Sequence, residues 1–212
     1  MIMNVPPDKK TEVASEEALR SLFDFFKQIL PLKQVEKNEL RSVVRQRNIR
    51  KRQFILQEED VCKHYTFVIS GCFRMFSVDK KGNEHNIQFA AENDWISDIG
   101  SFFSETPSKL FIEAIESSTV LQIEKKELLK LYTDSLKFNR NFRVMIENKY
   151  VELQNRVLQN ISSTAEERYT AFIEQYPHLS NRLPSTQIAS YLGVTPEFLS
   201  KVRKSIAGKT KA

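Results

Sequence analysis

The stretch STQIASYLGVTPEFLSKVRK, residues 185–204, decides how the C-terminal part of this chain folds. Ile188 and Leu192 precede Gly193 at helical spacing, and the apolar positions resume at Leu199. Two short helices with this pattern can share one small core. Gly193 supplies the left-handed backbone that a tight turn between them requires. The stretch therefore predicts a helix-turn-helix.

The second helix of this motif has a clear start signal. Thr195 is a hydroxyl N-cap, Pro196 suits the first helical position, and Glu197 faces the positive end of the helix dipole. Glu197 can accept a hydrogen bond from a cytosine amino group, and Lys201, one turn later, can donate to guanine. The polar side chains predicted to line this face or to contact phosphates are Ser185, Thr186, Ser200, Arg203 and Lys204. The alternative interpretation is a helical hairpin whose polar face is only solvated.

The charge of the chain is concentrated around this motif. Residues 1–136 carry 20 Lys and Arg against 21 Asp and Glu, whereas residues 137–212 carry 12 against 6. Nucleic-acid-binding domains carry such a local basic excess, although a solvated basic surface would give the same count.

Composition limits the class of protein. With 212 residues, 41% hydrophobic and 28% charged, the chain suits one large or two small globular domains. No apolar run approaches the ~18 residues that suggest a membrane span, and the first residues lack the pattern of a secretory signal. Cys62 and Cys72 are too few for a disulfide framework. These features favour a reduced, cytoplasmic protein without a membrane partner.

The N-terminal part is predicted to be helical after a disordered lead. Residues 1–14 are polar and lack periodicity, so we expect disorder there. Ser15 and two following acids open an amphipathic helix that ends near Pro31. A second short helix is expected at about residues 35–45.

From about residue 49 to 123 the apolar pattern changes to a period of two. Short runs rich in aromatic and β-branched residues are separated by turn signals. The runs lie at residues 54–56, 65–69, 73–78, 87–89 and 120–123. The sequence DKKGN, residues 79–83, predicts a hairpin turn. This region therefore predicts an antiparallel barrel or roll.

Residues 137–161 predict one long helix. An apolar stripe runs along it, and a second copy of the chain would cover this stripe in coiled-coil fashion. Packing against its own β-domain is the alternative. Ser163 and Glu166 then predict a capping box for a helix over residues 165–175. The residues predicted to form the dimer interface are Phe138, Phe142, Ile146, Tyr150, Leu153 and Val157.

Taken together, these parts resemble the Crp/Fnr superfamily of bacterial transcription regulators. The resemblance is carried by YTFVISG at residues 65–71, followed by FRM at residues 73–75, and by the helix-turn-helix. It implies a homodimer that binds a pseudo-palindromic double-stranded DNA operator and contacts RNA polymerase. It also implies base contacts from the position of Pro196, and Thr195 is counted with the DNA-binding residues.

The effector pocket departs from the family pattern. Cyclic-nucleotide-binding members hold the ribose with a glutamate and the cyclic phosphate with an arginine. Here Asp98 occupies the acid position, Ser97 replaces a glycine, and Ser108 or Lys109 stands where the arginine is expected. Neither supplies a guanidinium fork for phosphate. We therefore expect a different small ligand, or none.

Other sensor chemistries find little support. An iron-sulfur cluster needs about four thiolates, and the chain has two cysteines. Cys62 and Cys72 are a redox pair only if neighbouring strands bring them together; otherwise they are packing residues. A haem ligand would have to come from His64, His85 or His178. No catalytic constellation or phosphate-binding glycine loop is evident, so no enzyme activity or cofactor is expected.

The sequence thus predicts an α+β fold in three parts. A jelly-roll-like antiparallel β-roll effector domain spans residues 15–136, a long dimerisation helix spans 137–161, and a winged-helix-like domain spans 162–212. The last domain has no room for a full wing after the second helix. The predicted function is transcription regulation by sequence-specific DNA binding. The alternative is an effector-binding or protein-interaction module whose helix-turn-helix does not bind DNA.

Overall fold

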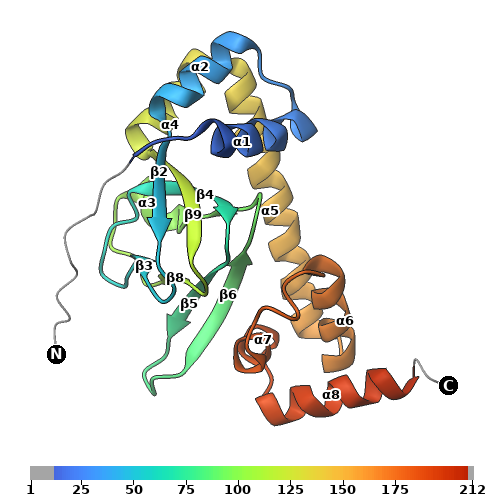
Figure 1. The fold of residues 1–212 in the computed structure, drawn as a ribbon. Helices are drawn as coiled ribbons and strands as arrows, with labels where there is room; N and C mark the ends of the chain where they lie inside the picture. Colours follow the sequence, from blue (N-terminus) through green and yellow to red (C-terminus); the bar gives the residue numbers. More distant parts are fainter. Residues whose placement is uncertain (1–11, 210–212) are drawn as a thin grey trace. The chain divides into compact units, whose positions relative to one another are not determined.

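The computed structural model describes residues 12–209, without the side chains beyond Ile206. It combines antiparallel sheets with helices, as predicted, in two compact units (Figure 1). The first unit comprises the residues up to Phe73 together with Ala90–Arg143, and the second comprises Arg74–Phe89 and the residues from Val144 onward. The second unit therefore joins a hairpin from the middle of the chain to the C-terminal helices. The predicted boundaries assigned that hairpin to the β-roll.

The first unit is built on a five-stranded sheet with the strand order β1-β2-β9-β4-β7. In its centre Tyr65 lies opposite Ile123 and Phe67 opposite Leu121. Strands β3 and β8 pair antiparallel with each other in a second sheet. The strands are β1 (Glu12–Val13), β2 (Arg45–Ile49), β3 (Phe54–Leu56), β4 (His64–Ser70), β7 (Trp95–Ile96), β8 (Phe111–Ala114) and β9 (Ser118–Glu124).

Helices α1, α2 and α4 of the first unit gather at one end of its strands (Figure 1). Ser15 begins the first helix as predicted, because its hydroxyl accepts a hydrogen bond from the backbone N–H of Ala18. Glu12 and Val13 form strand β1, which corrects the predicted disordered lead at its end; the rest of that lead lies outside the described residues. The helices are α1 (Glu16–Ile29), α2 (Gln34–Val43), α3 (Ile99–Ser104), α4 (Lys125–Asp134) and the start of α5 (Leu136–Ser162).

Gly71 joins β4 to the next strand in a conformation that only glycine tolerates. Its φ is +100°, and a Cβ atom there would lie 2.1 Å from Ser118 Oγ and 2.8 Å from Ser118 Cα. Both the left-handed backbone and the close approach of β9 therefore require glycine.

The second unit contains the hairpin and four helical segments. Strands β5 (Phe73–Val78) and β6 (Glu84–Ala90) are neighbours, and the predicted turn joins them. Helix α6 (Ala165–Gln175) has its predicted limits, but its cap differs by one residue: Thr164 and Glu167, and not Ser163 and Glu166, form the capping box. The remaining segments are the end of α5, α7 (Ser185–Leu192) and α8 (Pro196–Lys209).

Candidate nucleic-acid interface

Helices α7 and α8 form the helix-turn-helix that the sequence predicts. Gly193 ends α7 in the left-handed conformation with φ +67°. Its N–H donates to the carbonyls of Ala189 and Ser190, and the N–H of Val194 donates to the Ala189 carbonyl at 3.0 Å. The carbonyls at the end of α7 are satisfied in this way, so the turn is tight and defined.

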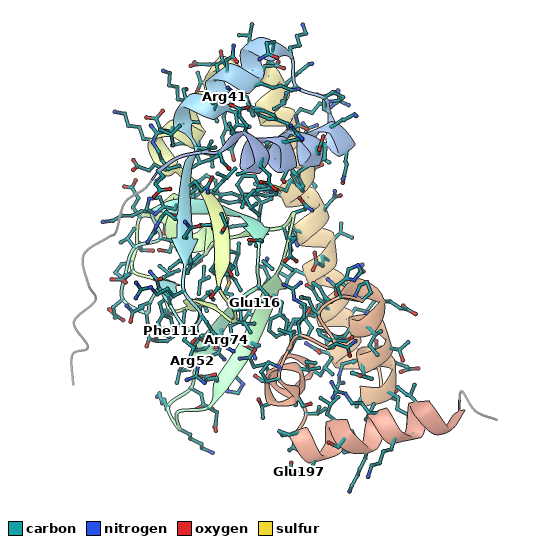
Figure 2. The ribbon with its side chains drawn as sticks, in the orientation of Figure 1. Arg41, Arg52, Arg74, Phe111, Glu116 and Glu197 are labelled. Carbon is teal, nitrogen blue, oxygen red and sulfur yellow. The ribbon has the colours of Figure 1, made fainter. Side chains whose placement is uncertain are left out.

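The first turn of α8 holds an ionised acid. Thr195 Oγ1 accepts a hydrogen bond from the Phe198 N–H at 3.2 Å, and Pro196 is the first helical residue. The pKa of Glu197 is lowered because its carboxylate accepts from its own backbone N–H and from the Thr195 hydroxyl. The Glu197 side chain is solvent-exposed at this end of α8 (Figure 2). It is therefore available as a hydrogen-bond acceptor.

Helix α8 has one buried and one exposed face. Leu199 and Val202 are 1% and 4% exposed and pack into the second unit. The Ser200 hydroxyl donates a hydrogen bond to the Pro196 carbonyl at 3.0 Å. The predicted contact residues that lie exposed on α7, the turn or α8 are Ser185, Thr186, Thr195, Glu197, Ser200, Lys201 and Lys204, while Pro196 is half-buried.

Arg203 and Ser185 hold the motif together. Arg203 is half-buried; its Nη1 donates to Ser185 Oγ at 2.9 Å, and its Nε donates to the Tyr169 hydroxyl at 2.9 Å. The guanidinium also lies over the Tyr169 ring, 5.4 Å from its centroid. Arg203, predicted as a phosphate contact, thus connects α8 to α6 and α7.

Strand β6 is attached to the first helix of the motif, which the sequence did not indicate. Ser190 Oγ donates to the Glu84 carbonyl at 2.7 Å and accepts from the Asn86 N–H at 3.0 Å. Asn86 Nδ2 donates to the Gln187 carbonyl at 3.1 Å. The ring of Phe89 lies 5.3 Å from that of Tyr191. The hairpin therefore packs on α7 through both polar and aromatic contacts.

Arg156 of α5 clamps the same junction. Its Nη1 donates to the Ile87 carbonyl, and its Nη2 donates to the carbonyls of Asn86 at 2.9 Å and Tyr191 at 3.2 Å. The guanidinium stacks 3.9 Å from the centroid of the Tyr191 ring. In the sequence Arg156 is one of several polar residues on a long helix, and only the carbonyls brought together by the fold identify its role.

The four residues predicted to line an effector pocket are largely engaged with protein groups. Asp98 caps α3 by accepting from the Ser101 N–H at 3.2 Å, and its other oxygen accepts from Ser108 Oγ at 2.7 Å. Ser97 is buried and lies within hydrogen-bonding distance of the His64 and Ile96 carbonyls. Lys109 is exposed. The structure does bring Asp98 and Ser108 together, but they are hydrogen-bonded to each other.

The predicted dimer stripe divides into two parts. Phe138 and Phe142 are 0% and 1% exposed and pack against Phe26 with ring centroids 5.9 Å and 5.6 Å away. Their assignment to a dimer interface is therefore wrong, because residues of their own unit cover them. Further along α5, Ile146 is half-buried. The exposed apolar side chains are Tyr150, Val151, Leu153, Val157, Leu158 and Ile161, of which Val151, Leu158 and Ile161 are not among the predicted interface residues.

The candidate sensor residues show no assembled site. Cys62 and Cys72 are both buried free thiols, and burial raises the pKa of Cys62. His85 Nε2 lies 3.1 Å from Asp79 Oδ2 in the exposed hairpin turn. Within the described part of the chain, no group of three His, Cys, Asp or Glu side chains is arranged to bind a metal ion. Across residues 12–209, none of the helices has both the length and the apolar character needed to cross a membrane.

Comparison with known proteins supports the fold. Residues 46–135 match the family described as cyclic nucleotide-binding domain. A curated relative, electron transport regulator A of Shewanella oneidensis, is 25% identical over 174 residues, which cover 76% of this chain and 68% of the relative.

Two solved structures show how far the likeness extends. FixK2 from Bradyrhizobium japonicum matches with a TM-score of 0.68 and 20% identity over 79% of this chain and 86% of its own. The regulator CLP of Xanthomonas campestris, described as responsive to c-di-GMP, matches with a TM-score of 0.67 and 11% identity over 84% and 93%. The resemblance inferred from the sequence is thereby confirmed at the level of the fold.

Proposed function

We propose that this protein is a dimeric, sequence-specific DNA-binding transcription regulator. The chain has the fold of the Crp/Fnr regulators, and one region matches the cyclic nucleotide-binding domain family. The observation that carries this proposal is the division of α8 into a buried apolar face and an exposed face with Glu197, Lys201 and Lys204. A helix of this kind presents hydrogen-bonding groups to base edges and cations to phosphates. Such a regulator would act in the cytoplasm and, by family resemblance, contact RNA polymerase.

Selection of bound sequences from random double-stranded DNA tests the proposal. We expect a pseudo-palindrome whose half-sites lie about 10 bp apart, because a dimer places two recognition helices on one face of the duplex. Glu197→Ala should relax the preference at one base pair of each half-site, where discrimination is worth about 1–3 kcal/mol. Lys204→Ala should instead weaken binding to all sequences alike. The absence of any enriched sequence would refute sequence-specific binding.

The exposed apolar stripe supports dimerisation along α5. Its members Tyr150, Leu153, Val157 and Ile161 recur every three or four residues and are between 50% and 80% exposed. Apolar residues at this spacing form the seam of a two-stranded coiled coil, and a second copy of the chain would bury them.

We propose that a small ligand other than a cyclic nucleotide, or none, acts as the effector. The segment from Ala90 to Ser135 contains no arginine, and the Asp98 carboxylate already accepts from Ser108. At the position of the family's arginine, the chain therefore offers no bidentate cation for a cyclic phosphate. Titration calorimetry with cyclic AMP and cyclic GMP should show no binding, and tight binding of either would mean that another cation, such as Lys109, takes that role.

One observation favours the alternative of an interaction module that does not bind DNA. Between Lys125 and Lys209 the structure contains helices, turns and loops but no strand, so the C-terminal helices supply no β-hairpin wing of their own. A chain that dimerises but binds no DNA at low salt would support this alternative.

A further inference from the structure

The second unit contains a β-hairpin beside its helix-turn-helix, although that hairpin comes from another part of the sequence. Strand β6 is bonded to α7 at Ser190 and Gln187, and Glu84 and Ser190 are 106 positions apart in the chain. A winged helix-turn-helix also places a β-hairpin next to its two helices. The hairpin β5–β6 therefore occupies the position of a wing beside α7.

The attachment is firm enough to position the hairpin. Arg156 donates to three carbonyls on β6 and α7, and Phe89 contacts both Tyr191 and Phe172, with ring centroids 5.3 Å and 6.3 Å away. Phe89 is fully buried and Asn86 is 3% exposed. Detaching the hairpin would expose the Phe89 ring and break the hydrogen bonds that Arg156 donates to the two elements.

The turn of the hairpin presents cations. Lys80 and Lys81 are exposed, and neither ammonium group pairs with a carboxylate of the described residues. The neighbouring acids are occupied: Asp79 accepts from the backbone N–H groups of Lys81 and Asn83 and lies beside His85. Glu84 pairs with Arg74. The turn therefore presents two lysine ammonium groups that form no ion pair within the described residues, and residues 79–85 together with Arg74 carry a net charge of +1.

The position of the hairpin turn suits a contact with the DNA phosphates that flank the major groove. The turn is closed by the hydrogen bond from the Asp79 N–H to the Asn83 carbonyl at 3.0 Å, and it lies directly before the attachment point at Glu84. The major groove that receives a recognition helix is about 12 Å wide. In Figure 1 the turn of the hairpin lies toward the end of this unit that carries α8. Cations in a turn that is attached to α7 would meet the phosphates beside the groove that receives α8.

We propose that the hairpin β5–β6 serves as a substitute wing, in which Lys80 and Lys81 bind phosphates of the DNA backbone flanking the site read by α8. This inference rests on the proposed DNA binding. It assigns a DNA contact to a segment that the sequence places in the effector domain. It also gives Arg156 a role as a positioning residue that fixes the hairpin on α7.

The test compares DNA affinity and its salt dependence for wild-type protein and the double variant Lys80→Ala/Lys81→Ala, on the selected operator. Two lost phosphate contacts should lower the slope of log K against log salt by about 1.8 and weaken binding on the order of tenfold to sixtyfold at 0.1 M salt, for all sequences alike. Lys80→Arg/Lys81→Arg should restore the slope. The control Lys63→Ala/Lys130→Ala removes two exposed lysines of the first unit and should change neither quantity.

Ethylation interference adds a readout that folding defects do not mimic. Wild-type protein should be blocked by ethylated phosphates outside the half-site, and the Lys80→Ala/Lys81→Ala variant should lose that interference while keeping the interference within the half-site. An unchanged slope and pattern in this variant, with Lys204→Ala still impaired, would overturn the substitute wing and leave DNA binding intact. Wild-type protein that binds no DNA would overturn both.

Discussion

Replacing Phe142 with alanine tests whether the start of α5 belongs to the core or to a dimer interface. The Phe142 ring is 1% exposed, and its centroid lies 5.2 Å from Tyr132 and 5.6 Å from both Phe26 and Trp95. Deleting a buried phenyl ring costs about 3–5 kcal/mol, and the aromatic pairs place this site at the upper end. Since a domain is stable by about 5–15 kcal/mol, a third or more of that stability should disappear.

Urea unfolding followed by tryptophan fluorescence measures this loss, because Trp95 is the only tryptophan in the chain and is 3% exposed. The matched variant Leu153→Ala, at a position 51% exposed, should cost less than about 1 kcal/mol at concentrations where the protein is monomeric. Suppose instead that Phe142→Ala kept wild-type stability and lost only its ability to dimerise. The ring would then lie in a dimer interface, and its place in the core would be refuted.

Three further expectations follow from particular contacts. Gly71→Ala should cost roughly 2–5 kcal/mol of stability, because of the left-handed backbone and the collision with Ser118. Gly82→Ala, with φ +83° but no atom within 4 Å, should cost only about 1–2 kcal/mol. Equal losses of stability in chemical denaturation would contradict the steric argument. Leu153→Glu should give folded monomers in sedimentation, and a wild-type chain that is itself monomeric at micromolar concentration would contradict the α5 seam. The Thr164 N–H and hydroxyl lower the pKa of Glu167. The stabilising contribution of the Glu167 carboxylate is therefore present above its unfolded pKa of about 4.3 and is lost as the pH falls through its folded pKa. Thr164→Ala should cost about 1 kcal/mol at pH 7 and should lose less thermal stability on acidification than the wild type.

Periodicity and caps were sufficient to predict most helices and the main strands. Helix α6 begins and ends where its pattern predicts, and the turn at Gly193 follows from local backbone requirements. The capping box was misplaced because Ser163 and Thr164 are both hydroxyl residues with an acid three positions later. Only the hydrogen bonds of the folded chain distinguish the two.

The errors concern contacts between distant parts of the sequence. An apolar stripe on a helix predicts that other residues cover it, but it does not identify the element or the chain that does so. Phe142 is covered by α1 and the sheet, whereas Leu153 on the same helix is exposed. Short elements such as α3 and β7 were also missed, because six and two residues are too few to show a period. In the same way, the hydrogen bonds of Arg156 depend on backbone carbonyls of β6 and α7, and no local sequence pattern predicts that these carbonyls lie together.

The second unit is discontinuous in sequence, and this limits how it can be made and exchanged. During synthesis at about 5–20 residues per second, β6 leaves the ribosome on the order of 5–20 s before α7, whose Ser190 is 106 positions beyond Glu84. Phe89 must stay without Tyr191 for that interval, which exposes the nascent chain to aggregation. A chimera that exchanges only the residues after Val144 would likewise separate the two halves of this core. Functional transplantation of the proposed DNA-binding unit therefore requires that Arg74–Phe89 be transferred with it.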